Sequence, residues 1–353
     1  MSRASLLALE QARSFEATRR FEDLALFHVD FDDLTGEQST ESTLSRMAGH
    51  GGRVALIGPS GSGKSSVMAA VLGPFATVLP NGVVPLRIPV AVEADETVTQ
   101  AGPFARHVIS AVTRWANPER FTAAERDALE RAAAERRHRS EPHRSRRFSL
   151  MTPGWIADAG FAVEVRSAGE DIESHVSSAD AVAGLARLIA LFRSHDLEPF
   201  FVIDDSDSWL QLPEVDRTAL ATGFLTEVMR MLTTELDCGF CIAVHNEYLV
   251  LDAYRRTESL LSTTIEIPRF EDAGTALGRI LSHRISLSGL ESTLTDVIDS
   301  DAVGALEVHY HSGANYSLRD VLKVADRALQ HACSEDLTSI NRRLVLQAIA
   351  DWV

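Results

Sequence analysis

The chain has 353 residues, of which 45% are hydrophobic and 24% charged, and its formal net charge is −16. These fractions are those of a soluble globular protein with room for two or three structural units, and the acidic balance argues against a protein that coats nucleic acid through its overall field. No apolar stretch approaches the roughly 20 residues that span a bilayer, and neither a secretory signal nor a disulfide framework is present, so we expect a cytoplasmic protein with no membrane contact.

The first 72 residues predict helices followed by the start of an α/β unit. Residues 1–30 have a polar, helical pattern and are expected to form an N-terminal helical segment. A second helix is predicted over 39–48. The apolar run Val54-Ala55-Leu56-Ile57 then predicts a buried strand, and the residues from Ser66 to Leu72 predict a helix.

Between that strand and that helix, the chain matches the phosphate-binding loop pattern G-x-x-x-x-G-K-[ST] in full, over Gly58, Pro59, Ser60, Gly61, Ser62, Gly63, Lys64 and Ser65. Backbone N–H groups of such a loop surround nucleotide phosphates, and the helix N-terminus adds its partial positive charge. We expect the loop, with Ser66, to bind ATP, Lys64 to reach the β- and γ-phosphates, and Ser65 to ligate Mg²⁺. Lysine occurs at only one other position, Lys323.

The middle of the chain starts with a strand predicted over 83–90, whose two prolines suggest an edge position or a bend. A helix is predicted over 103–116, and 152–178 has the composition of a loop. Between them lie six arginines that could grip the phosphates of DNA or RNA or bind an acidic partner; the alternative is a solvated helix. These are Arg136, Arg137, Arg139, Arg144, Arg146 and Arg147.

The second half returns to alternating helices and strands, with a helix predicted over 179–195, a strand over 199–203, a helix over about 214–234 and a strand over 240–244. This alternation predicts a parallel α/β sheet with helices on both faces. From about 271 to 353 the apolar pattern is almost wholly helical, so we expect a separate C-terminal helical unit.

Polar residues follow the two strands of this second half. Asp204 comes where a buried strand ends, as expected for the carboxylate that holds Mg²⁺ in loop-type ATPases, and Asp205 is the candidate to polarise the attacking water. The alternative is that Asp204, Asp205 and Asp207 simply cap the next helix. Asn246 follows the next strand and is expected to orient the water, provided that this strand neighbours both motif strands.

Three arginines are candidates for contacts with the γ-phosphate. Arg255 and Arg256 could reach the nucleotide of a neighbouring subunit as a finger, and Arg319 would face the phosphates if the helical unit folds over the site. The alternative in each case is a solvated surface arginine. Cys238 and Cys241 lack a second ligand pair at metal spacing and are expected to pack in the core, and no histidine pair predicts a zinc site.

Taken together, these motifs resemble those of the AAA+ ATPases, and within them the origin-recognition and cell-division-cycle initiator group with its bacterial relatives. The resemblance covers about 30–110 and 180–350. It rests on an adenine-pocket motif at 31–37, Walker A at 58–65, a Walker B-like Asp-Asp-x-Asp at 202–207, sensor 1 at Asn246, the arginine-finger box at 251–256 with the strand at 265–270, and sensor 2 at Arg319.

The resemblance implies an α/β, parallel-sheet P-loop NTPase (AAA+) core over 31–270, with an insertion at about 117–178, and a C-terminal α-helical lid over 271–353. It also implies ATP and Mg²⁺ as cofactors and a homo-oligomer whose nucleotide site is shared between subunits. Asp205 stands where many such ATPases have Glu, so we expect slow hydrolysis. The sequence ends at Val353, after the lid-like region, so we expect no winged-helix DNA-binding domain.

Several functions are compatible with these residues. The first is a nucleotide-controlled assembly switch for a partner protein, for example an effector in bacterial defence. The second is a DNA-associated regulator of replication initiation or transposition, which would use the arginines of 136–147. The third is a signalling NTPase of the STAND or KAP type with little turnover, or a scaffold with none, because the Asp-Asp-x-Asp pattern is also similar to that of such proteins.

Overall fold

The computed structural model describes residues 3–73, 78–90, 98–115 and 178–351. The insertion expected at about 117–178, with its six arginines, therefore lies almost entirely outside the described residues. No helix among those that the structure describes combines the length and the apolar character needed to cross a membrane.

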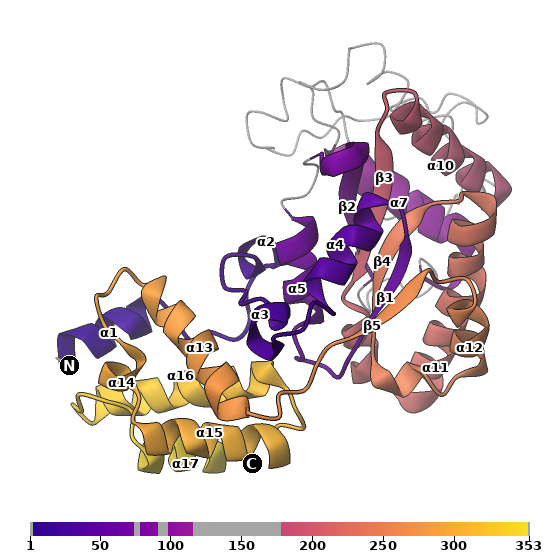
Figure 1. The fold of residues 1–353 in the computed structure, drawn as a ribbon. Coiled ribbons are helices and arrows are strands. Elements are labelled where there is room, and N and C mark those ends of the chain that lie inside the picture. Colours follow the sequence, from indigo (N-terminus) through magenta and orange to yellow (C-terminus); the bar gives the residue numbers. More distant parts are fainter. Residues whose placement is uncertain (1–2, 74–77, 91–97, 116–177, 352–353) are drawn as a thin grey trace, which may run out of the picture.

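The centre of the molecule is a five-stranded, all-parallel sheet (Figure 1). Its strands lie in the order β2 (Val83–Pro89), β3 (Glu198–Asp204), β4 (Gly239–Val244), β1 (Arg53–Ile57) and β5 (Thr263–Glu266). β2 is an edge strand, which is one of the two positions that its prolines suggested, because an edge tolerates a missing backbone donor. β4 lies between β1 and β3, so the carboxyl ends of these three strands meet at one edge of the sheet.

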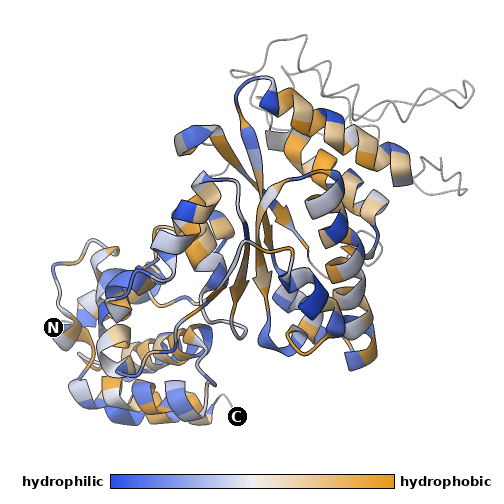
Figure 2. Cartoon of the chain, turned by 45° about the vertical axis from the view of Figure 1, so that its right-hand side comes forward, coloured by the Kyte–Doolittle hydropathy of each residue, from blue (hydrophilic) through white to orange (hydrophobic). Residues whose placement is uncertain are grey.

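Helices cover both faces of this sheet (Figure 2). Alternate residues of each strand enter different hydrophobic clusters: Val54 and Leu56 face one layer, and Ala55 and Ile57 the other. The first layer contains α4 (Glu41–Gly49) and α5 (Lys64–Leu72), and the second contains α7 (Ala101–Trp115) and α10 (Ser178–Arg193). The α/β class with a parallel sheet expected from the sequence is thus confirmed.

The helix predicted over 214–234 is not regular throughout. It starts as α11 (Glu214–Gly223) and continues in two π-helical turns, η4 (Phe224–Val228) and η5 (Met231–Glu235). The hydroxyls of Thr226 and Thr233 donate to backbone carbonyls one turn earlier, a contact that perturbs helices. Beyond β4 the chain forms η6 (Asn246–Tyr248) and α12 (Asp252–Glu258) before it enters β5.

The C-terminal residues form the helical unit expected from the sequence, shown in orange and yellow in Figure 1. Its members are α13 (Ala273–Ser286), α14 (Leu294–Val297), α15 (Ser300–Ser312), α16 (Leu318–Ser334) and α17 (Arg342–Ala350).

The N-terminal 30 residues do not form one helical segment. α1 (Arg3–Gln11) packs against α16, so both chain termini lie in the helical unit (Figure 1), whereas the short α2 (Phe21–Leu24) contacts α5. Leu6 and Leu9 of α1 are fully buried there. A helix of this length needs such a partner, because short isolated helices are marginal in water.

Candidate functional site

The phosphate-loop motif joins β1 to α5, as its sequence predicted. Gly61 and Gly63 have φ of 76° and 112°, a region that residues with a Cβ rarely adopt. The loop is also closely packed: a Cβ at Gly63 would lie 2.9 Å from the ring of Phe31, and one at Gly61 would lie 2.3 Å from Ser317 Oγ. Glycine is therefore required at both positions by the backbone and by the neighbours.

Lys64 is 3% exposed, and its ammonium is held at the mouth of the loop. Its Nζ donates to the carbonyls of Gly58 and Pro59 at 2.9 Å each and to Asp207 Oδ2 at 3.1 Å. Burial lowers the pKa of Lys64, and the charge of Asp207 opposes that shift. Asp207 is a site residue to which the sequence assigned no role; the signal was its place as the last acid of Asp-Asp-x-Asp.

Ser65 and Asp204 meet across the sheet edge. Ser65 Oγ donates to Asp204 Oδ1 at 2.9 Å, while Asp204 Oδ2 is buried without a hydrogen bond in the described structure. Burial, followed by the charge of Asp205, raises the pKa of Asp204 to about 6. A hydroxyl and a carboxylate with one unsatisfied oxygen are the hard ligands that Mg²⁺ takes in proteins, so this pair fits the metal.

The Asp205 side chain does not join the contact between Ser65 and Asp204. Its backbone is left-handed (φ 72°), and its Oδ2 accepts a hydrogen bond of 2.9 Å from Nη2 of Arg87 on the edge strand β2. The guanidinium of Arg87 also lies 4.3 Å from the ring centroid of Phe21 in α2. Arg87 was not among the candidates identified from the sequence, because this contact joins residues 118 positions apart. In this conformation the Asp205 carboxylate is engaged by a cation.

Asn246 follows β4, which neighbours both motif strands, so the condition set for its role is met. Its Oδ1 is buried and has no hydrogen-bond partner among the described residues. The preceding residue, His245, accepts from the backbone N–H of Glu247 through Nδ1, and burial lowers its pKa. An unsatisfied amide oxygen beside the phosphate-loop strand suits a water or a ligand hydroxyl.

Arg319 lies against the phosphate loop. Its backbone N–H donates to the carbonyl of Gly61 at 3.1 Å, and its Nη1 lies 3.4 Å from Ser60 Oγ. Ser317 caps the start of α16 by accepting from the N–H of Asp320. The N-terminus of a lid helix is therefore packed directly on the loop.

Arg255 and Arg256 are not part of this group. Both are exposed on α12, and Arg255 lies 3.5 Å from Asp252 of the same helix. Neither lines the pocket described next. Cys238 and Cys241 are buried free thiols whose pKa values are raised by burial, which agrees with core packing.

A pocket opens beside the loop and is bounded by four parts of the chain. The loop and α5 contribute Gly61, Gly63, Lys64, Ser65 and Ser66, and the segment after β3 contributes Asp207. The helical unit contributes Ile280, Arg284, Leu318, Arg319 and Leu322, and the N-terminal part of the chain contributes the remaining wall. That wall is largely apolar and comprises Ala17, Leu24, Phe27, His28, Val29, Phe31 and Leu34. A charged loop at one end and an apolar slot at the other suit a nucleotide.

Two short helices hold this wall, and each caps the N-terminus of the other with a carboxylate. Glu41 of α4 accepts from the N–H groups of Phe31 and Asp32, at the start of α3 (Phe31–Thr35). In return, Asp32 accepts from three N–H groups at the start of α4, those of Ser39, Thr40 and Ser42. Each carboxylate thus satisfies free donors of the other helix, which explains Asp32 of the 31–37 motif.

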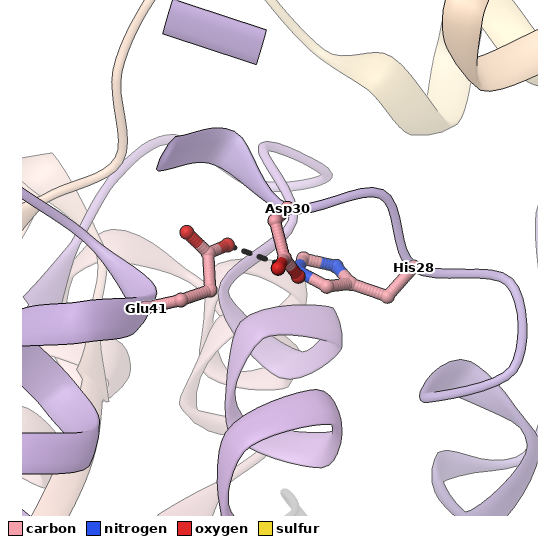
Figure 3. Close-up of side chains that lie close together, drawn as sticks. All are labelled: His28, Asp30 and Glu41. Carbon is pink, nitrogen blue, oxygen red and sulfur yellow. Dashed lines mark hydrogen bonds and ion pairs between the residues drawn. The ribbon is translucent and has the colours of Figure 1, made fainter. Parts of the chain in front are cut away.

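His28 connects these caps to the phosphate helix. Figure 3 shows the carboxyl groups of Asp30 and Glu41 beside its ring. His28 Nε2 lies 2.9 Å from Glu41 Oε1, and Nδ1 lies 2.9 Å from Ser66 Oγ. The spacing of this trio would allow a metal ion, which the sequence did not suggest, but its ring nitrogens and Glu41 oxygens already have protein partners. The cluster therefore links the apolar wall of the pocket to α5 through hydrogen bonds.

The chain is similar to several solved structures at low sequence identity. Two structures of the Aeropyrum pernix ORC2 protein, one with ADPNP and ADP and one in the ADP form, match 93% and 92% of this chain and 72% of theirs, with 13% and 14% identity and TM-scores of 0.49 and 0.48. Drosophila ORC bound to DNA matches 96% of this chain and 67% of its own, with 13% identity and a TM-score of 0.42. No protein-family model and no curated protein matches the sequence.

The packing of α16 on the loop can be tested with Gly61→Ala. The new Cβ would lie 2.3 Å from Ser317 Oγ and 2.7 Å from Arg319 Cβ, so we expect about 1–3 kcal/mol of destabilisation and weaker nucleotide binding. Gly36→Ala is the control, because Gly36 has the same φ of 76° but nothing within 4 Å of its Cβ position. Equal denaturant midpoints for the two variants would contradict the steric account.

A second test uses the raised pKa of Asp204. Mg²⁺ needs the ionised carboxylate, so its tightening of nucleotide binding should be present above about pH 7 and lost as the pH falls through about 6. Asp204→Asn should lack this tightening at every pH in calorimetric titrations.

The raised pKa of Asp204 also predicts how the stability of the nucleotide-free protein depends on pH. A carboxyl whose pKa rises from 3.8 to about 6 on folding stabilises the fold at low pH, and that contribution is lost as the pH rises through about 6. We therefore expect Asp204→Asn to melt higher than the wild type above that pH. A variant that melts no higher there would show that the carboxyl is not destabilised by its burial.

Proposed function

We propose that this chain is an ATP-binding module of the AAA+ type that works as a nucleotide-controlled assembly switch. The observation that carries the proposal is the contact between Ser65 and Asp204 at 2.9 Å, at the end of a phosphate loop with a buried lysine. The lid helix packed on Gly61 supports it, because nucleotide bound between loop and lid would bias their relative position.

In this proposal each group has one task. Gly58 to Ser66 surround the phosphates, and Lys64 moves from its carbonyl partners to the β- and γ-phosphates. Ser65 and Asp204 hold Mg²⁺, which neutralises charge on the phosphates when bound. Arg319, which already touches the loop, reports the γ-phosphate to α16, and Asn246 orients the attacking water.

Turnover is expected to be slow because Asp205 is paired with Arg87. The guanidinium occupies a carboxylate oxygen that would otherwise be available to accept a hydrogen bond from the attacking water. This pairing also favours the second candidate function, a signalling NTPase that binds nucleotide and rarely hydrolyses it. In either case the nucleotide state, rather than a released product, carries the information.

Assembly is assigned to Arg255 and Arg256. Because both are exposed and neither lines the pocket of its own chain, they are available to a neighbouring copy, whose nucleotide site would then be completed in trans. The controlled target is proposed to be a partner protein, for example a defence effector. The DNA-associated alternative depends on the arginines of 136–147, which lie outside the described residues.

The assembly proposal is tested by light scattering with and without ATP and Mg²⁺. We expect ATP to enlarge the wild-type particle, and Arg255→Ala/Arg256→Ala to assemble but hydrolyse at least about tenfold more slowly. Arg343→Ala, at an exposed arginine of α17, is the matched control. A wild-type chain that binds nucleotide and stays monomeric would refute self-assembly through this site, and unchanged hydrolysis in the double variant would refute the finger.

The restraint on Asp205 is tested by Arg87→Ala. Freeing the carboxylate should raise ATP turnover about threefold or more, since a positioned general base contributes far more than that to hydrolysis. Asp205→Asn in the same background should remove the gain. Arg53→Ala is the control, because Arg53 is also a strand arginine paired with an aspartate, at the opposite end of its strand. A fall in turnover with Arg87→Ala would show that the pair supports hydrolysis instead.

A further inference from the structure

Asp207 is the only acidic side chain among the described residues that lines the nucleotide pocket. Its Oδ2 accepts a hydrogen bond of 3.1 Å from Lys64 Nζ, and its Oδ1 is buried without a hydrogen-bond partner in the described structure. The Asp207 side chain is 20% exposed, whereas that of Lys64 is 3% exposed. An anion of the chain itself therefore already occupies the lysine that is expected to bind an anionic ligand.

The hydrogen bonds of Lys64 leave its ammonium no free donor for a ligand. An ammonium has three hydrogens, and in this structure they are directed to the carbonyl oxygens of Gly58 and Pro59 and to the Asp207 carboxylate. Any contact with a phosphate therefore breaks at least one of these bonds. The bond to Asp207 joins two charged groups, and charge-assisted hydrogen bonds are roughly twice as strong as neutral ones. Its loss is the largest single cost of moving Lys64 to a nucleotide.

The backbone that carries Asp207 is fixed at several points. Asp207 lies in the short helix η3 (Ser206–Gln211), which follows β3. Ser206 Oγ donates to the carbonyl of Ala243 in β4 at 2.7 Å, and the indole of the buried Trp209 donates to the backbone carbonyl directly after β2 at 2.6 Å. These bonds tie η3 to the ends of two other strands. The Asp207 backbone therefore stays in place when the lysine moves, and the carboxylate is left beside the anionic ligand.

We propose that Asp207 is a positioning residue that holds the Lys64 ammonium in the nucleotide-free chain and competes for it with the phosphates of the nucleotide. The paired state is the resting state, and nucleotide binds to the minority of molecules in which the ammonium is released. The apparent affinity of a ligand is reduced in proportion to the fraction of molecules that can receive it, so the pair weakens nucleotide binding. The inference rests on the proposed nucleotide site and concerns what sets the affinity of that site.

Calorimetric titration of the full chain with ATP and Mg²⁺ tests this competition. Asp207→Asn removes the charge with little change in shape, and Asp207→Ala removes the carboxyl group. We expect each variant to bind ATP about tenfold more tightly than the wild type, which corresponds to a competent fraction raised from about one tenth to nearly one. Asp207→Glu keeps the charge and should stay close to the wild type. Asp237→Asn is the matched control, because Asp237 also pairs with a basic residue, Arg53, but does not line the pocket.

NMR of the lysine ammonium groups tests whether the pair itself is broken. The chain contains only two lysines, Lys64 and Lys323, so protein labelled with ¹⁵N-lysine gives two side-chain signals, and Lys323→Arg identifies them. Without nucleotide, Asp207→Asn should shift the Lys64 signal. With saturating ATP and Mg²⁺ the Lys64 signals of the wild type and the variant should converge, because the ammonium has then left the side chain of residue 207 in both.

The inference is overturned if the two neutral variants bind ATP no more tightly than the wild type. Equal tightening by Asp207→Glu would also overturn it, because the effect would then not depend on the charge. Even if both neutral variants fold poorly, the wild type decides the matter, since a Lys64 signal that ATP leaves unchanged shows that the lysine keeps its partner. Failure of ATP to bind the wild type and every variant would instead refute the proposed function itself.

Discussion

Burial of the Lys64 ammonium is the constraint on which the site depends. A cation that is 3% exposed must be surrounded by acceptors, and two of them are carbonyls of the loop itself. The same loop contains Gly61 and Gly63 at positive φ, a backbone conformation that glycine adopts without strain. The third acceptor, Asp207, comes from beyond β3, so the same charge ties the loop to the second motif strand.

The strand order brings the phosphate loop and the acidic residues after β3 together at one edge of the sheet. β4 lies between β1 and β3, and parallel strands end at the same edge, so Ser65 and Asp204 meet although 139 positions separate them. The helical unit then closes the pocket from the other side, with Arg319 against Gly61 and with α13 supplying Ile280 and Arg284. The loop, the segment after β3, the helical unit and the N-terminal wall therefore all contribute to one pocket.

Charge is distributed unevenly around this enclosure, although the chain as a whole is acidic. Arg87 pairs with the carboxylate that is proposed as the base, and the buried Arg284 lines the pocket without a carboxylate partner among the described residues. Both act through positions that a phosphate-loop motif does not include.

The sequence by itself determined what depends on neighbouring residues. Short apolar runs predicted the strands and the glycine-rich loop predicted the phosphate site, and Pro85 and Pro89 suggested an edge position or a bend for their strand. Only the tertiary structure decided how distant side chains pair: Arg87 with Asp205, Asp207 with Lys64, α1 with α16, and Arg284 with the N-terminal backbone. Local periodicity indicates which face a residue occupies, but which groups meet there depends on strand order and on single backbone angles such as φ of Asp205.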